Sequence, residues 1–176
     1  IRFINEARDA KYYAQKVSDT GGVYLVPAFT GLGAPHWDMY ARGCIIGITR
    51  GTKREHIIRA AQESIAYQSY DLVQAMEKDT GFVLKELRVD GGASRDQFLM
   101  QFQADIMGKR LMRPAIRETT ALGAALLAGL ATGFWRSLDE ISKAYENGNV
   151  FEPVMDVQKR TALLHDWNRA VERCMK

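Results

Sequence analysis

The stretch Leu87-Arg88-Val89-Asp90-Gly91-Gly92-Ala93-Ser94 decides the fold of this chain, because an apolar run typical of a β-strand stops there at a pair of glycines. Two adjacent glycines remove the side chains that would keep a ligand off the backbone, and they allow dihedral angles that other residues avoid. Ser94 and Gln97 have the spacing of a capping box, which predicts a helix that begins near Arg95. The stretch therefore predicts a strand, a tight turn and a helix in direct succession.

Strand and helix patterns alternate on both sides of this turn. The expected strands are 23–29, 43–49, 84–90 and 110–113, and the expected helices are 5–17, one between Thr52 and Gly81, 95–107, 119–132, one capped by Ser137, and 157–176, with a turn at 147–149. Pro27 favours an edge position or a bulge for the first strand, whereas the second strand is expected to be buried on both faces. Such alternation predicts an α/β fold in which helices cover a sheet and ligands collect at the carboxyl ends of strands.

The glycine turn has two interpretations. The backbone amides of Gly91, Gly92 and Ala93 could grip a nucleotide, because the positive end of the next helix dipole faces the same turn. Asp96 could accept a hydrogen bond from an adenine amino group, or it could interact with the helix N-terminus and need no ligand. A tight strand-to-helix connection that binds nothing fits the same residues, so these residues alone leave both interpretations open.

Other polar residues are expected to have structural roles. The loop 30–38 carries His36 and Asp38, but no nucleophile or third metal ligand stands beside them. Asp90 at a strand end is expected to bind the backbone of the following turn. Gln62 lies on an apolar helix and would need hydrogen-bond partners at the edge of the core.

Composition narrows the class of protein. The 176 residues are 47% hydrophobic and 26% charged, which fits one globular domain. The net charge is only +3 and the basic residues are scattered along the chain, which argues against a nucleic-acid partner. Cys44 and Cys174 suggest neither a disulfide framework nor a metal site, so a reducing cytosol is expected. The longest apolar stretch, 121–131, is too short to span a membrane. The chain begins without methionine or a targeting segment and looks cut from a longer protein.

Several collinear segments resemble one family. Residues 43–48 and 56–63 match the C-terminal signature of the FGGY carbohydrate kinases at every defined position except Gln62, where an apolar residue is usual. Segments 26–35, 89–92, 98–106 and 118–125 resemble the bacterial glycerol kinases within that family. The likeness covers nearly the whole chain, which makes it far more specific than one glycine motif.

The resemblance implies a fold and a position in a larger protein. Members have the actin-like ATPase fold, with two ribonuclease-H-like domains and a cleft between them that holds ATP and substrate. Residues 1–176 would then form most of the C-terminal nucleotide-binding domain, a mixed sheet flanked by helices. The catalytic aspartate, the polyol-binding residues and the loops around the ATP phosphates would lie in the N-terminal domain and the missing start of this domain, so no catalytic or metal-binding residue is expected in this chain.

The resemblance also implies a function. It suggests ATP-dependent phosphorylation of glycerol to sn-glycerol 3-phosphate with Mg²⁺, in a cytoplasmic homodimer or homotetramer. The ATP-binding residues carried over are Gly91, Gly92, Ala93 and Asp96. The family commonly has asparagine where Asp96 stands, and a carboxylate can only accept from adenine. Two alternatives stay open, namely a kinase for another polyol or sugar and a catalytically silent nucleotide-binding module.

Overall fold

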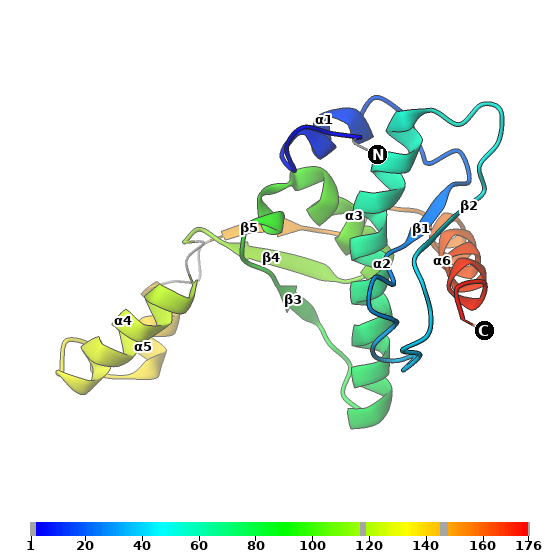
Figure 1. Ribbon diagram of the computed structural model, residues 1–176. Helices are drawn as coiled ribbons and strands as arrows, with labels where there is room; N and C mark the ends of the chain where they lie inside the picture. Colours follow the sequence, from blue (N-terminus) through cyan, green and yellow to red (C-terminus); the bar gives the residue numbers. More distant parts are fainter. Residues whose placement is uncertain (1–2, 117–118, 145–147, 176) are drawn as a thin grey trace.

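The chain folds around a three-stranded mixed sheet (Figure 1). A computed structural model describes residues 3–116, 119–144 and 148–175. Strand β3 (Glu86–Arg88) runs parallel to β4 (Arg110–Pro114), and β5 (Gly148–Phe151) pairs antiparallel with β4. The carboxyl ends of β3 and β4 therefore lie at the same edge of the sheet, which is the edge where the glycine turn begins.

Four helices pack against one another, and one of them covers this sheet. The long helix α2 (Arg54–Thr80) contacts both α1 (Asp9–Ala14) and α3 (Gln97–Met107), while α3 contacts β4, β5 and α6 (Val157–Glu172). Figure 1 shows α2 running the height of the molecule, with α3 between it and the sheet. The expected mixed sheet flanked by helices is confirmed.

Aromatic side chains join these helices in the core. Tyr67 on α2 stacks on Trp167 of α6 with ring centroids 5.0 Å apart, and it meets Phe102 of α3 edge to face at 5.6 Å. All three rings are buried. Such aromatic pairs contribute about 0.5–1.5 kcal/mol each beyond the area that they bury, so this cluster fixes α2, α3 and α6 relative to one another.

A second, two-stranded sheet is smaller than the sequence predicts. β1 (Tyr24–Val26) and β2 (Cys44–Ile46) pair antiparallel with Val26 opposite Cys44. β1 ends directly before Pro27, which has no N–H to donate to a partner strand. The expectation that the second strand is buried on both faces is wrong, because Ile45 is 39% exposed.

The cysteine prediction is also wrong. The structure joins Cys44 on β2 to Cys174 just after α6 as a disulfide, with Cα atoms 6.3 Å apart. The two residues are 130 positions apart in the sequence, and only the return of α6 to β1 and β2 brings them together. Spacing along the chain gives no signal for such a contact.

Two other local predictions need correction. The N-cap of α2 is Lys53, whose backbone N–H donates to Nδ1 of His56 at 2.9 Å, so the predicted box between Thr52 and Glu55 shifts by one residue. The predicted turn at 147–149 falls partly outside the described residues, and its described part belongs to strand β5, because the backbone pairs with β4.

The remaining helices form a projecting pair. Helices α4 (Thr119–Ala131) and α5 (Leu138–Ala144) lie apart from the body of the molecule in Figure 1. Ser137 caps α5 as predicted, because its Oγ accepts from the N–H of Glu140 at 3.2 Å. Within the described ranges, no helix combines the length and the apolar character that crossing a membrane would need.

Candidate functional site

The glycine turn follows β3 and leads into helix α3. Gly91 has φ of +80°, a left-handed angle that glycine adopts without strain, and Gly92 returns to the helical region. Residues Ala93–Arg95 form a single 3₁₀ turn, and Ser94 Oγ donates to the carbonyl oxygen of Gly91 at 2.8 Å. The main chain thus folds tightly upon itself at the carboxyl end of a strand.

Helix α3 begins two residues later than predicted, at Gln97 instead of near Arg95. The N-cap of α3 is Asp96, and Oδ1 of its carboxylate accepts from the N–H groups of Phe98 at 2.9 Å and Leu99 at 3.3 Å. Ser94 does not cap the helix: its hydroxyl donates to the carbonyl oxygen of Gly91, and the carboxylate of Asp96 accepts from the first amides of α3 instead. An aspartate at this position satisfies amides that the helix leaves free and interacts favourably with the positive end of the dipole.

The backbone of the turn is open on its outer side. A Cβ atom built on Gly91 or Gly92 would find no described atom within 4 Å. Gly92, Ala93 and Asp96 border a cavity of about 760 Å³, whose opposite wall comes from α1 and α2. Three of the four predicted site residues therefore share one cavity, whereas Gly91 does not line it.

The charge of the cavity suits an anionic ligand. Its lining includes three basic side chains, Arg8, Lys11 and Arg95, and one carboxylate, Asp96. Arg8 is paired with Glu6. Positive side chains near the free amides of a turn favour negatively charged groups such as phosphate.

Gln62 is a further residue of the site, and its hydrogen bond to Asp96 could not be predicted from the sequence. Its Nε2 donates to Oδ2 of Asp96 at 2.7 Å, which links the middle of α2 to the N-cap of α3. The sequence indicated that Gln62 would need a partner, but the partner lies 34 residues away. Oε1 of Gln62 is buried and has no hydrogen-bond partner among the described residues.

Asp90 and the loop 30–38 have other roles. Asp90 accepts a hydrogen bond from Thr119 at the start of α4, not from the backbone of its own turn as predicted. Asp38 accepts from the backbone N–H groups of Tyr40 and Ala41 at 2.8 and 3.0 Å. His36 faces Asp71 instead, so the loop does not bring its histidine and its carboxylate onto one ligand.

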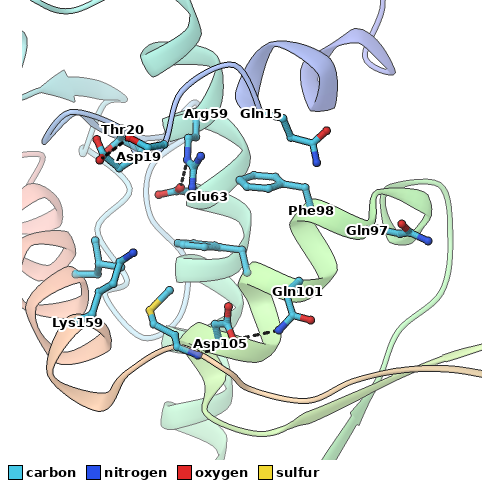
Figure 2. Close-up of a pocket in the computed structure, with 14 residues that line it drawn as sticks. Gln15, Asp19, Thr20, Arg59, Glu63, Gln97, Phe98, Gln101, Asp105 and Lys159 are labelled. Atoms are coloured by element: carbon cyan, nitrogen blue, oxygen red, sulfur yellow. Dashed lines mark hydrogen bonds and ion pairs between the residues drawn. The ribbon is translucent and has the colours of Figure 1, made fainter.

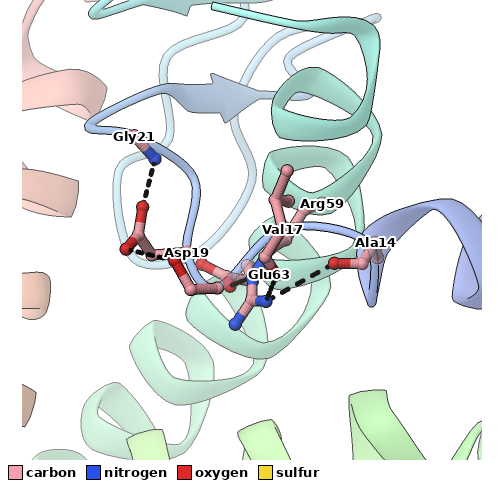
Figure 3. A network of polar contacts seen from close by, with 7 residues as sticks. Ala14, Val17, Asp19, Gly21, Arg59 and Glu63 are labelled. Carbon is pink, nitrogen blue, oxygen red and sulfur yellow. Dashed lines mark hydrogen bonds and ion pairs between the residues drawn. The ribbon is translucent and has the colours of Figure 1, made fainter.

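A second cavity of about 440 Å³ lies between α2, α3 and α6 (Figure 2). Its charged lining includes the ion pair between Arg59 and Glu63, with Nε and Oε1 2.7 Å apart. Burial raises the pKa of Glu63, although its hydrogen bond with Arg59 opposes that shift. Arg59 also donates to the carbonyl oxygen of Val17 at 2.6 Å (Figure 3), so these charged groups hold the chain after α1 in place.

The sequence comparison assigns most of this chain to a class of kinases. Residues 4–132 match the C-terminal domain of the FGGY family of carbohydrate kinases. The chain therefore belongs to the FGGY family of carbohydrate kinases.

The named relatives are more specific. The chain is 60% identical over 176 residues to a glycerol kinase of Caldanaerobacter subterraneus subsp. tengcongensis, covering 100% of this chain and 35% of that protein. It is 59% identical over 173 residues to glycerol kinase 2 of Pseudomonas aeruginosa, covering 98% of this chain and 34% of that protein. The chain thus spans about a third of the length of these relatives.

Solved structures show the same fold. The Plasmodium falciparum glycerol kinase with ADP superposes with a TM-score of 0.92 at 40% identity, covering 99% of this chain and 35% of that one. A ligand-bound xylulose kinase from Lactobacillus acidophilus superposes with a TM-score of 0.78 at 24% identity, covering 96% and 34%. The second likeness shows the fold alone.

Proposed function

We propose that this chain is the C-terminal nucleotide-binding domain of a longer glycerol kinase and that the cavity beside Gly92 holds the adenosine end of ATP. The observation that carries the proposal is the open main chain of Gly92, because no described atom lies within 4 Å of the place where a side chain would begin. An uncovered glycine beside a cavity with basic side chains suits a ligand that combines a flat base with phosphates. The Plasmodium relative that this chain superposes on was solved with ADP.

Each predicted residue has a task in this proposal. Gly91 shapes the turn through its positive φ, and Gly92 and Ala93 present their backbone to the nucleoside. Asp96 presents a carboxylate that accepts hydrogen bonds from the base. The domain would bind and orient ATP, and it would exclude water from one side of the nucleotide.

The reaction would be in-line attack of a glycerol hydroxyl oxygen on the γ-phosphorus of ATP, with ADP as the leaving group. The described part of this chain has no cluster of three His, Cys, Asp or Glu side chains that could hold a metal ion. By the resemblance to the family, Mg²⁺, the catalytic base and the glycerol-binding residues would be held by parts of the longer kinase outside these 176 residues. Mg²⁺ would neutralise charge on the phosphates.

Sequence identity favours glycerol over another substrate of the family. The two bacterial glycerol kinases share 60% and 59% identity with this chain and the Plasmodium glycerol kinase shares 40%, whereas the xylulose kinase shares 24%. The same proposal expects a cytoplasmic protein that forms a homodimer or homotetramer. Light scattering of the full-length protein would test the oligomeric state.

The test is a coupled assay of ADP release with the full-length protein. Glycerol with ATP should give turnover, whereas xylulose or gluconate should give little. The isolated 176-residue chain should give none, because it would lack the catalytic base. Turnover with a sugar but not with glycerol would replace the substrate assignment, and turnover by the isolated chain would refute the domain assignment.

A further inference from the structure

Gln62 and Asp96 form a partly buried pair at the wall of the cavity beside Gly92. Gln62 is only 9% exposed, and both residues line this cavity. The Nε2 group of Gln62 donates to Oδ2 of Asp96 at 2.7 Å. A hydrogen bond to a charged acceptor at this distance is of the stronger kind.

The carboxylate of Asp96 is held at both of its oxygen atoms. Oδ1 accepts from the N–H groups of Phe98 and Leu99, and Oδ2 accepts from Gln62. The carboxylate cannot rotate without breaking bonds at one oxygen or the other. Gln62 therefore fixes the one oxygen that capping of α3 leaves free.

The orientation of the Gln62 amide is set by the carboxylate of Asp96. Oε1 of Gln62 is buried without a partner among the described residues, which costs free energy. A half-turn of the amide would place Oε1 against the carboxylate of Asp96, and two acceptors would then face each other. The amide is thus held with its donor toward Asp96 despite the unpaired oxygen.

We propose that Gln62 is a positioning residue. It holds the carboxylate of Asp96 so that this wall of the cavity offers the base a hydrogen-bond acceptor and no donor. This rests on the proposed function of the cavity. A carboxylate fixed in this way favours a purine whose 6-substituent donates, such as the amino group of adenine. It disfavours hypoxanthine, whose 6-carbonyl would face another acceptor. An asparagine could turn its amide toward either base, so the carboxylate sets the selectivity and Gln62 keeps it in place.

The experiment measures the dissociation constants of ATP and ITP for the full-length protein by calorimetry. The wild type should bind ATP about tenfold or more tightly than ITP, because the two nucleotides differ at the group that Asp96 would meet. Gln62→Met, which keeps the volume and removes the donor, should lower this preference about threefold or more. Asp96→Asn should lower it about tenfold and keep the cap of α3, because asparagine caps helices as well.

Gln97→Met is the matched control, because Gln97 is exposed and does not line this cavity. This control should leave the preference for ATP over ITP unchanged. If Gln62→Met does not fold, Gln62→Leu takes its place. A loss of stability alone would weaken ATP and ITP equally, so the ratio separates positioning from a structural role. An unchanged ratio in the Gln62 variant, or equal binding by the wild type, overturns this inference and leaves the proposed function standing. Failure of the wild type to bind ATP overturns both.

Discussion

Arg113 on β4 donates through Nη1 to the carbonyl oxygen of Ser94 at 2.5 Å, and so fixes the glycine turn to the sheet. Its Nη2 donates to Oδ1 of Asn149 on β5 at 3.0 Å. The side chain is buried, and its guanidinium lies 5.5 Å from the ring centroid of Phe151. A buried cation thus links two strands to the 3₁₀ turn that follows Gly92.

Replacement of this arginine should damage both the turn and the stability of the domain. Arg113→Met removes two hydrogen bonds and leaves the carbonyl of Ser94 without this donor, which costs about 1–3 kcal/mol. Urea unfolding should show the loss, and calorimetry should show weaker ATP binding. Arg88→Met on β3 is the control, because Arg88 is exposed and should change neither quantity. Wild-type stability in Arg113→Met would contradict the anchoring role.

The turn itself was predictable from sequence, but its supports were not. Adjacent glycines after an apolar run are a local signal, and Gly91 indeed requires a positive φ. Arg113 and Gln62 lie 19 and 34 residues from the groups that they bind, so no local pattern connects them. The sequence identified Gln62 as a polar residue in need of a partner, and only the packing of α2 on α3 supplies that partner.

The predicted boundaries of two elements were wrong for related reasons. The choice between Ser94 and Asp96 as N-cap depends on which oxygen reaches the free amides, and the hydroxyl of Ser94 turns back to Gly91. Similarly, the sequence predicts a turn at 147–149, but pairing with β4 makes its described residues, Gly148 and Asn149, part of a strand. In both cases contacts outside the local pattern decided the structure.

A side chain at Gly92 should block the nucleotide and leave the fold intact. Its φ of −62° suits any residue, and a Cβ would meet no described atom within 4 Å. Gly92→Val should therefore keep the melting temperature and weaken ATP binding about tenfold or more, because its methyl groups would occupy space of the ribose or base.

Gly51→Val is the matched control for this substitution. Gly51 is exposed, and a Cβ there would meet only Thr49 Oγ1, at an ordinary 3.8 Å. The control should bind ATP like the wild type. Calorimetry that finds equal affinity in Gly92→Val and the wild type would place the nucleoside elsewhere.

Asp71 on α2 should make stability depend on pH. Burial raises the pKa of Asp71, although a hydrogen bond from Trp167 Nε1 at 2.7 Å and the neighbouring His36 oppose the shift. A raised pKa in the folded state means that the contribution of Asp71 to stability is fully present below its unfolded pKa of about 3.9. That contribution is lost as the pH rises through the folded pKa.

Asp71→Asn removes this titration and can still accept from Trp167. The variant should therefore match the wild type near pH 3.5 and become more stable relative to it as the pH rises toward 7. Thermal unfolding at several pH values measures the difference, and Asp79→Asn at the exposed end of α2 is the control. A stability difference that does not change with pH would exclude a raised pKa at Asp71.

Arg59 and Glu63 should be strongly coupled, because Glu63 is buried, the side chain of Arg59 is only 13% exposed, and Nε lies 2.7 Å from Oε1 (Figure 3). Arg59→Met leaves the Glu63 carboxylate buried without its counter-ion and should cost about 3–5 kcal/mol in urea unfolding. The double variant Arg59→Met, Glu63→Met removes that uncompensated charge and should be more stable than the single variant. It should stay below the wild type, because the carbonyl oxygens of Ala14 and Val17 still lose their donor. If the two substitutions were simply additive, the pair would not be coupled, and Arg59 would act through the chain after α1 alone.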